Sequence, residues 1–306
     1  MIKVTNLHKS YREYKVLDGI DFQVEDGKIY GFLGHNGVGK STTMNILTGL
    51  IDYNKGHIEI DGMSMTKNKK EIMKKIGYLP EDPKFYPYMT GFEYLNFIGE
   101  VIGYSKKDIK TRTEKLLEEV DLKKAANRKV GGYSRGMRQR LGLAVAVYNN
   151  PNIIFLDEPS SALDPEGRKD MLNIIKRLKD ENITVFLSTH ILNDVERVCD
   201  EVAILNDKKI TLKGSLEEIT NKYISPVYDI EFKKEFNSDI AELNKNKWID
   251  KINVDKNMIS VYVNNSDIAG SKLLKIISQF DNPVISYNLR KNNLEEIFMK
   301  VVKGNE

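Results

Sequence analysis

A glycine-rich segment between a short apolar run and a helix-forming stretch is where the sequence first indicates chemistry. Residues 34–41 read G-H-N-G-V-G-K-S and satisfy the pattern G-x-x-x-x-G-K-[ST]. Glycines let consecutive backbone N–H groups surround an anion, and the following helix presents its positive end to it. Lys40 would add a point charge at the β- and γ-phosphates of a nucleotide, and the Ser41 hydroxyl would contact Mg²⁺. The segment therefore predicts a phosphate-binding loop, with a turn that binds nothing as the alternative.

Two further apolar runs end in side chains that suit nucleotide hydrolysis. Residues 153–156 are followed by Asp157 and Glu158, and residues 184–187 lead through Ser-Thr to His190. The carboxyl ends of parallel strands meet at one sheet edge, where ligands bind. Asp157 would hold Mg²⁺ through its water shell, and Glu158 would accept a proton from the water that attacks the γ-phosphate. A histidine after a strand is more often structural, but its position beside the other loops favours a role for His190.

A third segment, residues 133–140, reads Y-S-R-G-M-R-Q-R and precedes a helix with one apolar face. Ser134 is expected to cap this helix, which leaves free backbone N–H groups at a positively charged end. Those donors have no obvious partner in their own chain.

Together these motifs resemble those of the ATP-binding subunits of ABC transporters, over residues 1 to about 220. The matching segments are Walker A (34–42), the signature (133–137), Walker B (153–158), the D-loop (161–164) and the switch histidine, His190. In that family the signature helix of one subunit caps the γ-phosphate held by Walker A of the other. The resemblance implies a Mg²⁺-dependent ATPase in which two nucleotide-binding domains, in a homodimer or heterodimer, close head to tail around two ATP molecules and open on hydrolysis.

The motifs and the resemblance together define a set of expected site residues. Catalytic roles fall to Glu158 as the base, His190 as the group that orients water and γ-phosphate, and Lys40. Nucleotide contacts are expected from Tyr11, Gly34, His35, Asn36, Gly37, Val38, Gly39, Lys40, Ser41, Thr42, Ser134, Gly136 and Asp164. Mg²⁺ contacts are expected from Ser41, Asp157 and Glu81. Tyr11 matches the aromatic residue that stacks on adenine; Tyr14 competes for that role, and the alternative is that both rings merely pack.

Two segments depart from the family's pattern. After residues 76–79 the family usually has glutamine, whereas this chain has Pro80 and Glu81. A carboxylate binds Mg²⁺ more strongly than an amide but adds negative charge near the phosphates. The signature reads Y-S-R-G-M instead of L-S-G-G-Q. It keeps Ser134 and Gly136, which face phosphate in the family, and leaves the strength of the closed dimer open.

The elements expected to position these motifs alternate strands and helices, as in a mostly parallel sheet. Strands are expected at 2–8, 16–24, 29–33, 76–79, 153–156, 183–187 and 201–205, and helices at 40–50, 166–180 and 191–198. Residues 82–150 turn helical, with helices at 91–102, 105–120 and 135–148. We therefore expect an α/β P-loop NTPase core of the ABC type, residues 1–220, with an inserted helical subdomain.

Residues 221–306 form a second, accessory domain in this interpretation. The expected elements are a strand at 227–233, a helix at 239–245, strands at 249–254 and 257–263, a helix at 267–279 and a strand at 283–289. This βαββαβ order predicts a small α+β, ferredoxin-like fold. The domain shows no catalytic constellation, and dimerisation, regulation and binding of a small ligand remain its three candidate roles.

Composition narrows the class of protein. The 306 residues carry 47 Lys+Arg against 44 Asp+Glu, a formal charge of +3, which disfavours nucleic acid as the main partner. Cys199 is the only cysteine, which excludes a disulfide framework or a multi-cysteine zinc site and fits a reducing cytosol. No window approaches the roughly 18 apolar residues that span a bilayer. Any membrane role would therefore need partner chains.

The resemblance favours such membrane partners. Aromatic residues gather between 81 and 103, namely Phe85, Tyr86, Tyr88, Phe92, Tyr94 and Phe97. They either fill the subdomain's own core or line a groove for a helix of a separate transmembrane permease, which the family places there. The C-terminal extension, with the N-L-E-E-I-F sequence at 293–298, is similar to that of bacterial ABC-2 type exporters of antibiotics, drugs or lipids. This implies peripheral attachment to the cytoplasmic face of the membrane. The rival is a soluble regulatory ATPase switch without transport; a P-loop kinase or GTPase would explain neither the signature nor the switch histidine.

Overall fold

The structure, a computed structural model, describes residues 1–161, 163–223, 226–236, 240–290, 294–295 and 297–298. The chain forms two compact units, one comprising Met1–Leu216 and the other beginning at Glu217. The sequence prediction placed this division after residue 220. Each unit has its own hydrophobic core.

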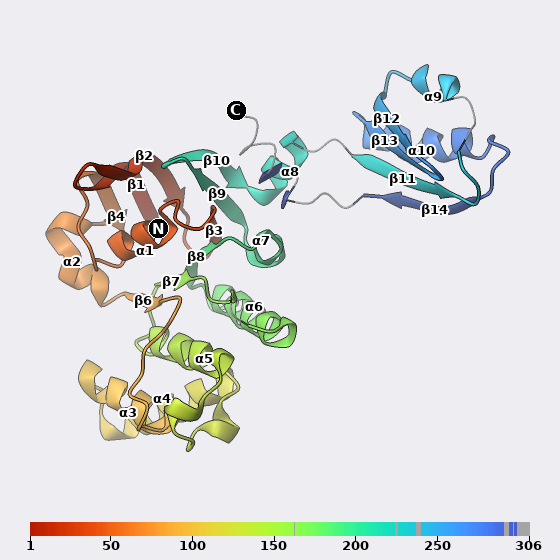
Figure 1. Ribbon diagram of the computed structural model, residues 1–306. Coiled ribbons are helices and arrows are strands. Elements are labelled where there is room, and N and C mark those ends of the chain that lie inside the picture. The colour runs from red at the N-terminus through yellow and green to blue at the C-terminus, as the bar shows by residue number, and fades with distance from the viewer. Residues whose placement is uncertain (162, 224–225, 237–239, 291–293, 296, 299–306) are drawn as a thin grey trace. The chain divides into compact units, whose positions relative to one another are not determined.

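A six-stranded sheet organises the first unit, with strand order β10-β9-β3-β8-β7-β6 (Figure 1). Its strands are β3 (Ile29–Leu33), β6 (Ile76–Leu79), β7 (Ile153–Asp157), β8 (Thr184–Thr189), β9 (Glu201–Asn206) and β10 (Lys209–Ser215). All pairs are parallel except β9 with β10. Every residue of β3, β7 and β8 is buried, which explains their continuous apolar runs. The predicted mostly parallel sheet is confirmed.

A second, antiparallel sheet packs against the first. Its order is β2-β1-β4-β5, formed by β1 (Ile2–Tyr11), β2 (Tyr14–Val24), β4 (Lys55–Ile60) and β5 (Met63–Ser64). The core between the sheets contains a cluster of aromatic rings, Phe22, Tyr30, Phe32, Phe155 and Phe186, with neighbouring centroids 5.4 to 5.9 Å apart. Four of these side chains lie on β3, β7 and β8. Their packing holds together the strands whose carboxyl ends carry the predicted site.

Helices complete the first unit. Those next to the sheets are α1 (Lys40–Leu47), α2 (Met65–Met73), α6 (Pro165–Asp180) and α7 (Leu192–Val198), and α8 (Leu216–Tyr223) begins at the division between the units. The helices α3 (Gly91–Ile102), α4 (Lys106–Glu119) and α5 (Arg135–Ala146) group together, as Figure 1 shows. Short 3₁₀ turns at Lys123–Ala125 and Val130–Gly132 connect α4 to α5. The inserted helical subdomain is thus present where the periodicity predicted it.

The second unit contains β11 (Val227–Phe232), α9 (Ala241–Asn244), β12 (Ile249–Asp255), β13 (Met258–Val263), α10 (Ser266–Ile277) and β14 (Val284–Leu289). Its sheet is antiparallel with strand order β12-β13-β11-β14. This is the βαββαβ arrangement that the sequence predicted. The predicted helix at 239–245 and the segment 293–298 lie partly outside the described residues.

Among the described residues, no helix combines the length and apolar character that a membrane span requires.

Candidate active site

The glycine-rich loop folds around the Lys40 side chain at the start of α1. Its Nζ donates hydrogen bonds to the carbonyl oxygens of Gly34 (2.8 Å) and His35 (3.3 Å). Gly39 has φ 119°, and a Cβ there would lie 3.0 Å from Leu17 Cδ2 and 3.3 Å from the Val16 carbonyl oxygen. Glycine is therefore required where the loop passes β2 and enters the helix.

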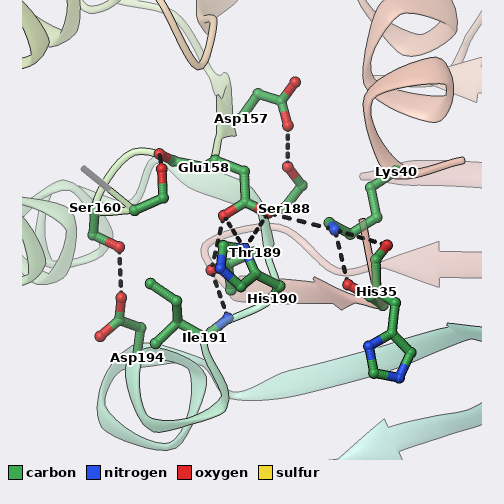
Figure 2. Close-up of polar contacts among 12 residues, drawn as sticks. His35, Lys40, Asp157, Glu158, Ser160, Ser188, Thr189, His190, Ile191 and Asp194 are labelled. Atoms are coloured by element: carbon green, nitrogen blue, oxygen red, sulfur yellow. Dashed lines mark hydrogen bonds and ion pairs between the residues drawn. The ribbon is translucent and has the colours of Figure 1, made fainter. Parts of the chain in front are cut away.

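Glu158 lies between two nitrogen-bearing side chains at the end of β7 (Figure 2). Its Oε1 is 3.4 Å from Lys40 Nζ, and both carboxylate oxygens are 3.0 Å from His190 Nδ1. The Glu158 backbone adopts φ 48°, in the left-handed region that non-glycine residues seldom occupy. Ser161 stabilises this turn because its backbone N–H and its hydroxyl both donate to the Glu158 carbonyl oxygen. The carboxylate is thus held in a defined orientation at the sheet edge.

The neighbouring Asp157 points away from Glu158, as Figure 2 shows, and accepts a hydrogen bond from the Ser188 hydroxyl. Burial raises the pKa of Asp157, while hydrogen bonds from Ser188 and Ser41 oppose that shift. A buried carboxylate beside a serine hydroxyl is a hard oxygen donor set that fits Mg²⁺, whose charge would offset the cost of burying the anion. The surroundings of Ser41 and Asp157 therefore suit the ion that the sequence predicts.

A second buried carboxylate, Asp194 on α7, connects the elements that carry the site. It is 1% exposed and accepts hydrogen bonds of 2.5 Å from Ser160 Oγ, two residues after Glu158, and from Arg168 Nε on α6. Figure 2 shows the Ser160 contact. This link was not predicted from the sequence. The signal available for it was an acidic residue four positions after His190, within the predicted helix at 191–198.

Most predicted contact residues surround one pocket of about 670 Å³. Its lining comprises Tyr14, Val16, Asn36, Gly37, Gly39, Lys40, Ser41, Thr42, Glu81, Arg135, Glu158, Ser161 and His190. An adjoining pocket is lined by His35 and Val38, together with Tyr14 and the loop that joins β9 to β10. Residues from six separate stretches of the chain thus meet where the sequence predicted the nucleotide, and Val16, Arg135 and Ser161 were not expected among them.

The aromatic position differs from the expectation. Tyr14 lines the pocket and is 65% exposed, whereas Tyr11 is absent from the lining and lies beside Lys9, whose Nζ is 4.7 Å from its ring centroid. Tyr14 shares a face of β2 with Val16, which also lines the pocket. The geometry therefore favours Tyr14, the competing choice, over Tyr11.

Of the signature residues, Arg135 lines this pocket, whereas Ser134 and Gly136 lie outside its lining. Ser134 caps α5 and accepts the Met137 backbone N–H at 3.2 Å, as predicted. Gly136 is close to the D-loop, since a Cβ there would lie 3.3 Å from Leu163 Cδ2. Asp164 caps α6, where it accepts the Gly167 N–H at 3.2 Å.

The signature helix is also tied to the segment that follows β6. Gln139 is 1% exposed and donates a 2.5 Å hydrogen bond to the carbonyl oxygen of Glu81. A movement of the Glu81 backbone would therefore displace the Gln139 side chain and, through it, α5.

Comparison with known proteins agrees with this arrangement. Residues 17–161 match the family model described as ABC transporter, and residues 214–302 match one described as ATP-binding protein DrrA1-3-like, C-terminal domain. An uncharacterized ABC transporter ATP-binding protein of Bacillus subtilis, YxlF, is 37% identical over 303 residues, covering 99% of both chains. This chain belongs to the ABC transporter ATP-binding proteins.

Other members of the family extend the comparison. The bacitracin transport ATP-binding protein BcrA of Bacillus licheniformis is 37% identical over 310 residues, covering 99% of this chain and 98% of its own. Among solved structures, a dimeric post-hydrolysis state of the ATP-binding cassette MJ0796, bound to ADP and Pi, superposes with a TM-score of 0.65 at 26% identity. That match covers 71% of this chain and 99% of the cassette. The α/β P-loop fold predicted for this ABC cassette is thereby confirmed.

Proposed function

We propose that this chain is a Mg²⁺-dependent ATPase that powers export of a substrate through separate transmembrane subunits. The observation that carries the catalytic part is the placement of Glu158, 5% exposed, between Lys40 and His190 in the pocket beside the phosphate loop. A water on the γ-phosphate within reach of Glu158 would lose its proton to this carboxylate.

The residues predicted to form the site have distinct roles in this mechanism. The loop N–H groups and the start of α1 bind the phosphates, and Lys40 offsets negative charge that develops on the β- and γ-oxygens. His190 holds the Glu158 carboxylate and orients water and γ-phosphate. Ser41, Asp157 and Glu81 would hold Mg²⁺. When bound, that ion would supply positive charge that offsets the negative charge of the phosphates.

The second half of each site comes from another nucleotide-binding domain. Ser134 and Gly136 lie at the N-terminal end of α5, outside the pocket of their own chain. We assign them to the γ-phosphate held by a partner, identical or homologous, in a head-to-tail dimer. The dimeric state of the MJ0796 cassette supports this assignment. Asp164, at the start of α6, is assigned to the same interface.

Transport requires a partner in the membrane, and the helical subdomain offers a surface for one. Tyr86 and Tyr88, whose ring centroids are 5.7 Å apart, are 49% and 66% exposed, and Phe97 is 37% exposed. Phe85 and Tyr94 are more enclosed, so the cluster is partly core and partly surface. We propose that the exposed rings receive a cytoplasmic helix of the permease. This would place the chain at the cytoplasmic face of the membrane.

The export assignment rests on relatives whose names state transport, namely BcrA and the lantibiotic transport ATP-binding protein SrtF of Streptococcus pyogenes, which is 36% identical over 230 residues. The rival, a soluble regulatory switch, is tested by purifying tagged Glu158→Gln from gently solubilised membranes with ATP and Mg²⁺. We expect mass spectrometry to identify a polytopic membrane protein that co-purifies in an amount roughly equal to that of the tagged chain. A Tyr88→Asp variant should bind ATP normally but recover less of this membrane protein. Recovery from the soluble fraction alone would favour the switch.

A further inference from the structure

The two edges of the C-terminal sheet differ in a way that suggests different roles. The edge strand β12 carries Asp250, Lys251 and Asp255, charges of the kind that protect an edge against pairing with another chain. The opposite edge, β14, reads V-I-S-Y-N-L and carries neither a carboxylate nor a basic group. Ile285 and Leu289 on it are 60% and 51% exposed. Thus β14 is an unprotected apolar edge.

The backbone of β14 also has hydrogen-bonding groups directed away from the sheet. The Arg290 N–H donates to the Val227 carbonyl oxygen on β11 at 2.7 Å. Because alternate residues of an antiparallel strand bond to the same neighbour, the N–H and C=O groups of Tyr287 and Leu289 face the other way. Ile285 has no partner in the β11 register, which shifts between Glu231 and Phe232. Within the described part of the chain, no strand pairs with this side of β14.

We propose that β14 pairs antiparallel with β14 of a second copy of this chain and joins the two C-terminal sheets. A two-fold axis at Tyr287 sets this residue opposite its own copy and Ile285 opposite Leu289. The strand is complementary to itself in this register, because the two most exposed apolar side chains then cover each other and the outward Tyr287 backbone groups meet. A partner of another sequence would need to supply both the apolar side chains that cover Ile285 and Leu289 and the backbone groups that pair with Tyr287.

This interface lies outside the ATP site and would act together with it. A single pair of short strands is smaller than interfaces stable alone, which bury at least about 1,200 Å². Two chains already held by ATP in one transporter would present their β14 strands to each other at an effective concentration of about 1 mM. Weak pairing at β14 would then keep the two cassettes associated after hydrolysis opens the ATP sites.

Site-specific disulfide cross-linking tests the register in the full chain carrying Glu158→Gln, with ATP and Mg²⁺ present, after gel filtration has confirmed that the cassettes are held together as a dimer. Ile285→Cys and Leu289→Cys proteins are mixed and oxidised. Opposed residues have Cα atoms about 5.5 Å apart, within disulfide range. We expect a covalent dimer in the mixture and its loss when either variant is oxidised alone, since like positions would lie several residues apart.

The matched control is Val254→Cys on β12, which is 45% exposed on the charged edge and should not cross-link with either variant. Cys199 is buried and common to all the proteins. Circular dichroism checks that each variant is folded. Absence of dimer in the mixture of folded Ile285→Cys and Leu289→Cys, or equal dimer with Val254→Cys, would overturn the proposal.

Discussion

The Nδ1 atom of His190 lies 3.0 Å from both carboxylate oxygens of Glu158, although 32 residues separate them in the chain. The contact joins the ends of β7 and β8, which pair in parallel register with Asp157 opposite Ser188. Lys40 approaches the same carboxylate from the phosphate loop, at 3.4 Å. The almost fully buried carboxylate that we propose as the base is therefore oriented from two sides, and such preorganised sites avoid reorganisation during reaction.

Tyr14 and Tyr11 form a matched pair of variants for the adenine contact. Tyr14 lines the pocket and Tyr11 does not. Removal of a stacking ring costs about 0.5–1.5 kcal/mol, so Tyr14→Ala should weaken ATP binding roughly twofold to tenfold. Tyr11→Ala should leave it unchanged. Titration with a fluorescent ATP analogue measures both, and a larger effect of Tyr11→Ala would restore the original assignment.

Glu81 lines the pocket at the position where the family usually has glutamine. If its carboxylate contacts Mg²⁺ or the water around it, Glu81→Gln should raise the Mg²⁺ concentration for half-maximal ATPase rate roughly tenfold while nucleotide affinity changes little. Asp82→Asn, one residue on and exposed, is the control. Superimposable Mg²⁺ titrations of Glu81→Gln and the parent protein would remove Glu81 from the metal site.

Asp194 is expected to position the turn after Glu158. Asp194→Asn weakens the contacts with Ser160 and Arg168 in a buried setting, so the unfolding free energy in urea should fall by about 2–4 kcal/mol. Because the turn would loosen, kcat should fall while KM for ATP stays constant. The exposed Asp180→Asn should change stability by less than about 0.5 kcal/mol. A KM effect without a kcat effect would contradict the positioning role.

Asp229 gives the C-terminal unit a predictable response to acid. Hydrogen bonds from Arg290, at 2.6 and 2.7 Å, hold the pKa of Asp229 below its ordinary value of about 4. The folded-state pKa is therefore below the unfolded one, so this stabilisation is complete above about pH 4 and is lost as pH falls through the folded-state pKa.

Asp229→Asn should accordingly lower stability at neutral pH by about 1 kcal/mol, a value reduced for partial exposure, and should weaken the acid dependence. Trp248, the only tryptophan, is buried in this unit and reports its unfolding by fluorescence. The exposed Asp255→Asn is the control. An unchanged acid transition in Asp229→Asn would show that the Arg290 pair does not stabilise this unit.

The sequence predicted those parts of the fold whose local pattern is strong. Continuous apolar runs identified β3, β7 and β8, because strands buried on both faces need apolar residues throughout. The strands β4 and β10 were not predicted. Their sequences, K-G-H-I-E-I and K-I-T-L-K-G-S, mix charged and apolar residues, because each strand is partly exposed. The strand β4 pairs with the distant β1, whereas β10 pairs with β9, which directly precedes it.

Site residues that belong to a motif were predictable from the sequence, whereas site contacts that depend on packing were less so. Lys40 and Glu158 were identified by their spacing within motifs. The choice between Tyr11 and Tyr14 depends on which ring the β1–β2 hairpin brings to the pocket, and two aromatic residues in one hairpin carry no such information. Likewise, the contacts of Asp194 and Gln139 arise from tertiary packing, which no local pattern encodes.

The turnover of Glu158→Gln under saturating ATP and Mg²⁺ tests directly whether Glu158 is the base for ATP hydrolysis. Glutamine keeps the shape of the side chain but cannot accept the proton of the attacking water. We predict a loss of roughly 10²–10⁴ fold in turnover. ATP binding should be retained, because Lys40 and the phosphate loop are intact. Turnover equal to that of the parent protein would show that Glu158 is not the base.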